Sequence, residues 1–220
     1  MTHLEDQLHQ LRQQLVELWE LVIHQVKKTQ EALTDFDKDL AREVVVNEKR
    51  VNALELKIDR DCENIFALFN PVAVDLRLVL AVLKINNNLE RTGDIAEGIA
   101  KFIVSAKSPF DPHLLGATRV IIMYEEANAM LQDIMSAFIN EDTKLARSIF
   151  KRDEVLDDIN RDANRVIMDH VRDHPENLEH CLHILSTIRK LERVGDQSKN
   201  IAEEIIFYVE AKVLKHSGKM

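Results

Sequence analysis

Residues 89–100, LERTGDIAEGIA, and residues 191–202, LERVGDQSKNIA, are two copies of one stretch. Leu, Glu, Arg, Gly, Asp, Ile and Ala recur in the same order and at the same spacing. A second matching pair, DKDLAR at 37–42 and DTKLAR at 142–147, lies upstream of each copy. Repetition of this kind indicates a duplicated architecture. We therefore expect two similar units, at residues 1–107 and 113–215, joined by a proline-containing linker.

The composition favours long helices with few turns. Only 5 of the 220 residues are Gly and only 4 are Pro. Proline does not continue a helix, so the prolines mark breaks between elements. The apolar periodicity between the breaks predicts six helices, over about residues 4–33, 37–69, 71–106, 113–139, 143–172 and 176–215. The sequence thus predicts an all-α protein made of two pseudo-repeated three-helix bundles.

The charge and the cysteines restrict the class of protein. The formal net charge of -9 argues against non-specific binding to nucleic acid and favours metal ions or basic protein surfaces as partners. No apolar run approaches the roughly 20 residues of a membrane-spanning helix, and no basic-then-apolar leader is present. Cys62 and Cys181 lack zinc-ligand spacing, which indicates buried thiols in a reducing compartment. We expect a cytoplasmic protein without direct membrane insertion.

Each copy of the repeated motif places two acids four residues apart, on one face of a helix. The pairs are Glu90 with Asp94 and Glu192 with Asp196. Like charges at this spacing repel, and Gly93 and Gly195 each cost a further ~1 kcal/mol relative to alanine in a helix interior. Both glycines fall within the apolar stripes of their helices. We therefore expect a neighbouring helix to approach closely at each glycine.

The helix before each motif also carries acids and amides at helical spacing. These residues are Glu48, Asn52, Glu55 and Asp59 in the first unit and Asp153, Asp157, Asn160 and Asn164 in the second. If the two helices of a unit are neighbours, their carboxylates converge on a groove of oxygen ligands, which suits Mg²⁺, Ca²⁺, Mn²⁺ or iron in an oxo cluster. The alternative is a solvated acidic face, partly paired with Arg91, Lys190 or Arg193. The residues alone leave both interpretations open.

The sequence contains no positive sign of an enzyme. It has neither a glycine-rich phosphate loop nor a nucleophile motif. A ferritin-like di-iron enzyme needs Glu-x-x-His motifs, and no Glu stands three residues before a His here. We expect a protein that acts by binding, with a metal-dependent helical-bundle oxidoreductase as the less favoured alternative.

Several separated segments resemble the PhoU family along nearly the whole chain. They are both copies of the motif, the second continuing through Asn200 to Glu203, together with PVAVDLR at 71–77 and LKINNN at 83–88. The resemblance implies a cytoplasmic accessory regulator of phosphate uptake, which keeps the phosphate-starvation response off when phosphate is plentiful. It also implies a homodimer, with the ATPase subunit of the phosphate ABC transporter and a phosphate-sensing histidine kinase as partners. A PhoU-like accessory of another phosphate transporter, without a kinase partner, is the alternative.

The resemblance also implies bound metal at Glu/Asp-x-x-x-Asp motifs, with iron or zinc in some family members. The matching residues here are Glu48, Glu90, Asp94, Asp153, Asp157, Glu192 and Asp196; magnesium or manganese would also suit these ligands. Two departures weaken the first unit: Asn52 replaces the second acid after Glu48, and Gly98 replaces the asparagine found at Asn200. We therefore expect metal in the second unit before the first.

Overall fold

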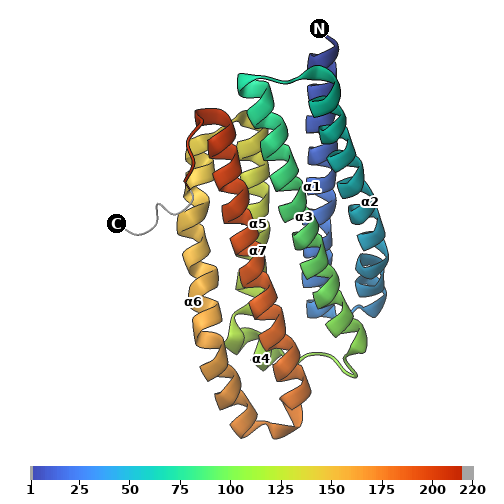
Figure 1. Cartoon of the computed structure of the whole chain (residues 1–220). Coiled ribbons are helices and arrows are strands. Elements are labelled where there is room, and N and C mark those ends of the chain that lie inside the picture. Colours follow the sequence, from blue (N-terminus) through green and yellow to red (C-terminus); the bar gives the residue numbers. More distant parts are fainter. Residues whose placement is uncertain (1, 215–220) are drawn as a thin grey trace.

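The structure is a computed structural model that describes residues 2–214, all of them in helices or short connections. Its elements are α1 (His3–Asp35), α2 (Lys38–Phe69), α3 (Ala73–Ser105), α4 (Pro112–Thr118), α5 (Val120–Asn140), α6 (Thr143–Asp173), the 3₁₀ helix η1 (Pro175–Asn177) and α7 (Leu178–Glu210). Helices α1, α2 and α3 pack on one another, and so do α5, α6 and α7 (Figure 1). The predicted all-α fold of two three-helix bundles is confirmed.

The shorter repeated stretch forms the beginning of the middle helix in each bundle. Asp37 caps α2 by accepting hydrogen bonds from the backbone N–H groups of the second and third residues after it. Asp142 caps α6 in the same way. Such caps typically contribute about 1 kcal/mol each, because they satisfy N–H groups that have no partner inside the helix. The repetition in the sequence is therefore a repetition of local structure.

The fourth predicted helix, over residues 113–139, is wrong as a single element. The chain breaks at Arg119, which has a left-handed backbone with φ 57°, so that α4 and α5 are separate. Leu114 and Leu115 are buried, and α4 packs on α6 and α7 as well as on α5. The burial of these two leucines stabilises the fold and offsets the free-energy cost of interrupting the helix. No proline or glycine at the break announces it in the sequence.

Two other predicted helix boundaries are also wrong. The last helix ends at Glu210 rather than at residue 215, which lies outside the described residues, and Ala211 follows it with a left-handed backbone. Helix α3 begins at Ala73 rather than at Pro71, because the preceding Val72 has an extended backbone. The predicted break at residues 173–175 is confirmed, and η1 follows it.

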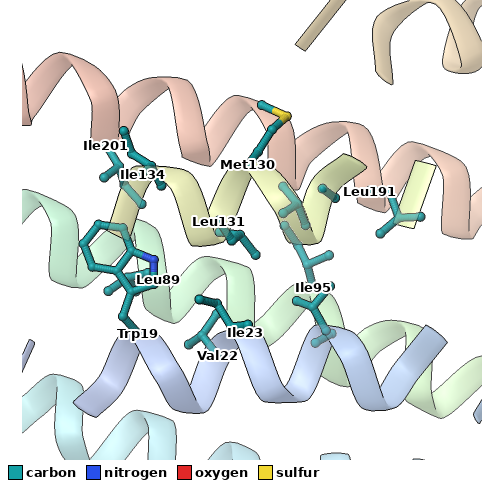
Figure 2. Packing of buried hydrophobic residues seen from close by; sticks show 14 of the residues in the cluster. Trp19, Val22, Ile23, Leu89, Ile95, Met130, Leu131, Ile134, Leu191 and Ile201 are labelled. Carbon is teal, nitrogen blue, oxygen red and sulfur yellow. The ribbon is translucent and has the colours of Figure 1, made fainter. Parts of the chain in front are cut away.

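The two bundles share one hydrophobic core. Helix α3 packs along α7, and α1 packs on α5. Figure 2 shows the contact: Trp19 and Leu89 of the first bundle lie near Leu131 and Ile134 of the second. Trp19 is fully buried, with its ring centroid 5.9 Å from that of Phe138. The division at residues 1–107 and 113–215 follows the repeat, and as a division into domains it stays a prediction.

The two cysteines are free and buried, as the sequence predicts. Burial raises the pKa of the Cys62 thiol to about 12 and also raises that of Cys181, so both thiols stay protonated and unreactive. Within residues 2–214, no helix combines the length and the apolar character needed to cross a membrane.

Candidate functional site

Each repeated motif faces a buried carboxylate on the neighbouring helix of its own bundle. Helix α2 packs along α3 and α6 along α7, as expected. A Cβ atom added to Gly93 would lie 3.0 Å from Val51 Cγ1 and 3.1 Å from Glu48 Oε2. A Cβ atom added to Gly195 would overlap Asp153 Oδ1 and lie 2.9 Å from the Leu156 side chain. The predicted close approach at the glycines is confirmed, and its effect is to make room for an acid in each bundle.

We define the first groove by four acids between α2 and α3: Glu48, Glu90, Asp94 and Glu97. The Glu48 side chain is buried, and its Oε2 accepts a long hydrogen bond of 3.5 Å from Gln25 Nε2 on α1. Among the residues that the structure describes, its Oε1 has no hydrogen-bond partner. Burial raises the pKa of Glu48 to about 7, and the negative charge of Asp94 adds to this effect. Lys190 lies within electrostatic reach of Asp94 and Glu97 but forms no ion pair with Glu48 in the described part of the chain.

We define the second groove by Asp153, Asp157, Glu192 and Asp196, between α6 and α7. Asp153 is also buried, but here the Lys199 ammonium forms salt bridges with both Asp153 and Asp196, the latter at 2.9 Å. Burial raises the pKa of Asp153, and Lys199 opposes this rise. Burial lowers the pKa of Lys199, but hydrogen bonds to the two aspartates outweigh this effect, so the pKa is raised. A lysine of the chain itself thus supplies positive charge to the second groove.

The remaining acids lie at the rims of the grooves. Burial and Asp94 raise the pKa of Glu90. Burial raises the pKa of Glu192, and the charges of Asp196, Asp157 and Asp153 add to it, in that order. The carboxylates of neighbouring helices therefore influence one another electrostatically across each groove.

The other motif residues singled out from the sequence lie mainly between the two bundles. They are Arg91, Gly98, Arg193 and Asn200. Asn200 Nδ2 donates a hydrogen bond of 3.4 Å to Asn88 Oδ1, which connects α7 to α3. Arg91 and Arg193 line a pocket between these helices with Lys190, Gly98 and two acids of the first groove, Asp94 and Glu97. A Cβ atom at Gly98 would lie 2.5 Å from Lys190 Nζ, so this glycine makes room for the lysine. Within residues 2–214, none of the three cations forms a salt bridge with an acid.

The two grooves offer ligands for a hard cation but do not hold them in a finished metal site. The oxygen donors are suitable, and the buried atoms Glu48 Oε1 and Asp153 Oδ1 have no hydrogen-bond partner. As the side chains stand in the described part of the chain, no three His, Cys, Asp or Glu residues are grouped so that they could hold a metal ion. A metal ion would have to draw the carboxylates of two helices together.

Sequence reasoning gave no role to Gln25 and Lys199, which contact the buried acids of the two grooves. Gln25 is buried on the apolar face of α1, which also carries Leu18 and Val22, and a polar residue in such a stripe is a visible signal. Lys199 stands three residues after Asp196, within the repeated motif itself, and this spacing favours an ion pair on a helix.

The fold and the grooves together define a duplicated helical bundle in which a motif glycine admits a buried carboxylate once in each repeat. This arrangement agrees with comparisons against known proteins. The chain belongs to the PhoU domain family, whose model matches residues 15–103 and 120–205.

Curated relatives and solved structures match over almost the full length. The phosphate-specific transport system accessory protein PhoU homolog of Aquifex aeolicus (strain VF5) is 31% identical over 212 residues, covering 96% of this chain and 94% of the relative. The accessory protein PhoU of Escherichia coli (strain K12) is 31% identical over 212 residues, covering 96% and 87%. The crystal structure of PhoU from Pseudomonas aeruginosa aligns with a TM-score of 0.89 at 31% identity, covering 94% of this chain and 99% of that one.

Proposed function

We propose that this protein is a cytoplasmic negative regulator of the phosphate-starvation response that also modulates phosphate uptake. It acts by binding other proteins rather than by catalysis. Its partners are the ATPase subunit of the phosphate ABC transporter and a phosphate-sensing histidine kinase, and it works as a homodimer. The observation that carries this proposal is the near full-length match, in both repeats, to relatives named as accessory proteins of phosphate-specific transport.

The surface supports an action through protein binding. Several large apolar side chains are exposed where α2 ends and α3 begins: Leu68 and Val72 are more than two-thirds exposed, and Val74 and Leu76 are also exposed. These residues lie close together in the chain, in the last turn of α2, the connection after it and the first turn of α3. An apolar surface of this kind suits a protein partner better than it suits solvent.

We also propose that the carboxylate grooves take up a divalent or iron ion. The chemistry of the donors and the unpartnered oxygen of Glu48 support this. A bound ion would neutralise the carboxylates and link the two helices of a groove. Because it would bind only the folded chain, it would also stabilise the fold.

The test is a phosphate-starvation reporter in cells that lack this protein, grown in abundant phosphate. We expect the reporter to switch on, because the brake on the response has been removed. Restoring the intact gene should switch the reporter off again, which serves as the control. A silent reporter with a working control would contradict the regulatory role and would favour an accessory of another phosphate transporter.

A further inference from the structure

The repeat places two equivalent pairs of residues across the interface between α3 and α7 (Figure 1). When the two copies of the motif are aligned, Asn88 corresponds to Lys190 and Gly98 corresponds to Asn200. One pair, Asn88 and Asn200, joins the helices through a hydrogen bond between the two amides. In the other pair, Lys190 lies against Gly98 and occupies the space that a larger residue at Gly98 would fill. The interface therefore has a neutral contact at one place and a cation at the equivalent place.

The arginines of both motif copies lie beside this lysine. Arg91 on α3 and Arg193 on α7 hold the same position in the motif, and both line the pocket of about 400 Å³ that contains Lys190. Ligand pockets in proteins are typically about 300–1,000 Å³ in volume. We call this the cationic pocket and define it by Arg91, Lys190 and Arg193. The two arginines are exposed, and Lys190 lies half-buried between the helices.

The acids of the cationic pocket do not neutralise its three cations. Glu97 already forms an ion pair with Lys101, 2.6 Å away on the next turn of α3. Asp94 lies within electrostatic reach of Lys190 but, within residues 2–214, forms no salt bridge. One carboxylate without an ion pair thus accompanies three cations without ion pairs, which leaves a surplus of two positive charges.

The environment of Lys190 favours an anion. Burial lowers the pKa of its ammonium group, and the positive charge of Arg193 lowers it further. Its Nζ atom lies 5.7 Å from the centroid of the Phe102 ring, so one side of the ammonium group faces an aromatic ring rather than water. A bound anion would replace the missing hydration and offset the repulsion between Lys190 and Arg193.

We propose that the cationic pocket binds a small molecule through a phosphoryl group, which Arg91, Lys190 and Arg193 hold between the two bundles. Arginine forks match the oxygens of a phosphoryl group in a bidentate manner. At pH 7 such a group carries a charge of about −1.5 to −2, which balances the surplus in the pocket. The ligand would connect α3 to α7 and so stabilise the contact between the bundles. This inference does not depend on metal in the carboxylate grooves or on the regulatory role.

Isothermal titration calorimetry of the full chain tests the proposal with inorganic phosphate and with AMP, in a phosphate-free buffer that contains a chelator. The chelator keeps metal out of the carboxylate grooves. The wild type should bind one phosphoryl group per chain, and Arg193→Gln and Lys190→Met should each weaken binding about tenfold or more, because each removes a charged hydrogen-bond donor. Arg189→Gln removes one charge from an exposed neighbouring position of α7 and should leave the affinity unchanged.

A third variant tests the role of the glycine. Gly98→Asn introduces the residue found at the equivalent position 200, and its Cβ atom would lie 2.5 Å from Lys190 Nζ. The lysine must then move, and binding should again weaken about tenfold or more. Thermal unfolding of the same samples controls folding: without ligand all variants should melt cooperatively, and phosphate or AMP should raise the melting temperature of the wild type but not that of Arg193→Gln.

The outcomes also identify the source of the phosphoryl group. Equal affinity for the two ligands supports free phosphate, whereas tighter binding of AMP supports a phosphate monoester. The proposal is overturned if neither ligand binds at millimolar concentration, if acetate binds as tightly as phosphate, or if any of the three pocket variants binds like the wild type. The starvation reporter does not depend on these results, so the regulatory role stands or falls separately.

Discussion

Glu48 extends its carboxyl group into the interior between α1, α2 and α3, where, among residues 2–214, the amide of Gln25 is its one hydrogen-bond partner. In the unfolded chain the same group is solvated and has an ordinary pKa near 4.5. Folding therefore disfavours the charged form of Glu48, and protonation favours the folded state. The contribution of Glu48 to stability is complete below the unfolded pKa and is lost as the pH rises through about 7.

Glu48→Gln should remove this pH dependence. In the presence of a chelator, the wild type should lose on the order of 3 kcal/mol of unfolding free energy from this group between pH 4.5 and pH 8, a loss that the amide variant escapes. Urea unfolding of both proteins at pH 5 and pH 8 measures the difference. Glu63→Gln, at an exposed position of the same helix, is the control. Equal pH dependence in the wild type and Glu48→Gln would contradict the assignment.

The sequence was sufficient to predict which acid-bearing helices are neighbours but not how the charge between them is balanced. Spacing places Glu90 with Asp94 and Glu192 with Asp196 on helix faces, and the repeat implies a partner helix for each pair. The state of each groove depends on where the long side chain of Lys199 lies and on how deeply Glu48 is buried. These are properties of tertiary packing, and periodicity carries no information about them.

At the scale of the elements, the distance between two helices is set by single glycines. Gly93 and Gly195 weaken their own helices but let a carboxylate-bearing neighbour pack against the backbone. Gly116 of α4 has no atom within 4 Å of its added Cβ, so it has no such role. The break at Arg119 was not predictable from the sequence: an arginine takes a left-handed backbone where α4, with its buried Leu114 and Leu115, is followed by α5.

Alanine substitutions distinguish these glycines. Gly195→Ala should destabilise the protein by about 1–3 kcal/mol, because the new methyl group overlaps Asp153 and crowds Leu156. Gly116→Ala should stabilise it by about 0.5–1 kcal/mol, because it meets no atom and improves helix propensity. Chemical denaturation of both variants measures the two shifts. The same sign of shift at both positions would contradict the packing described for α6 and α7.

At the scale of the whole molecule, the two bundles are joined through their cores rather than through the linker alone. Trp19 of α1 packs against Phe138 of α5, and the Lys84–Glu204 salt bridge of 2.9 Å connects α3 to α7. Buried residues from all four of these helices belong to one cluster. Such contacts favour a single cooperative unit over two domains that unfold separately.

The chain should therefore unfold in one transition. Trp19, the single tryptophan, reports the contact between the bundles, and far-ultraviolet circular dichroism reports the helices of both. The two signals should give the same midpoint in urea. Phe138→Ala should lower the unfolding free energy by about 3–5 kcal/mol and shift both signals together. Separate midpoints for the two signals would show that the bundles unfold independently.

Glu97 and Lys199 occupy the same position in the two copies of the motif but carry opposite charges, and this difference has an evolutionary consequence. Codons for lysine and glutamate differ by a single base, so one point mutation is enough to exchange an ammonium for a carboxylate at this position of either copy. After the gene segment was duplicated, the two copies were free to diverge here without rebuilding the surrounding helices, which retain the same Leu, Glu, Arg, Gly and Asp. A lineage can thus specialise one repeat, or restore the symmetry of both, in a single mutational step.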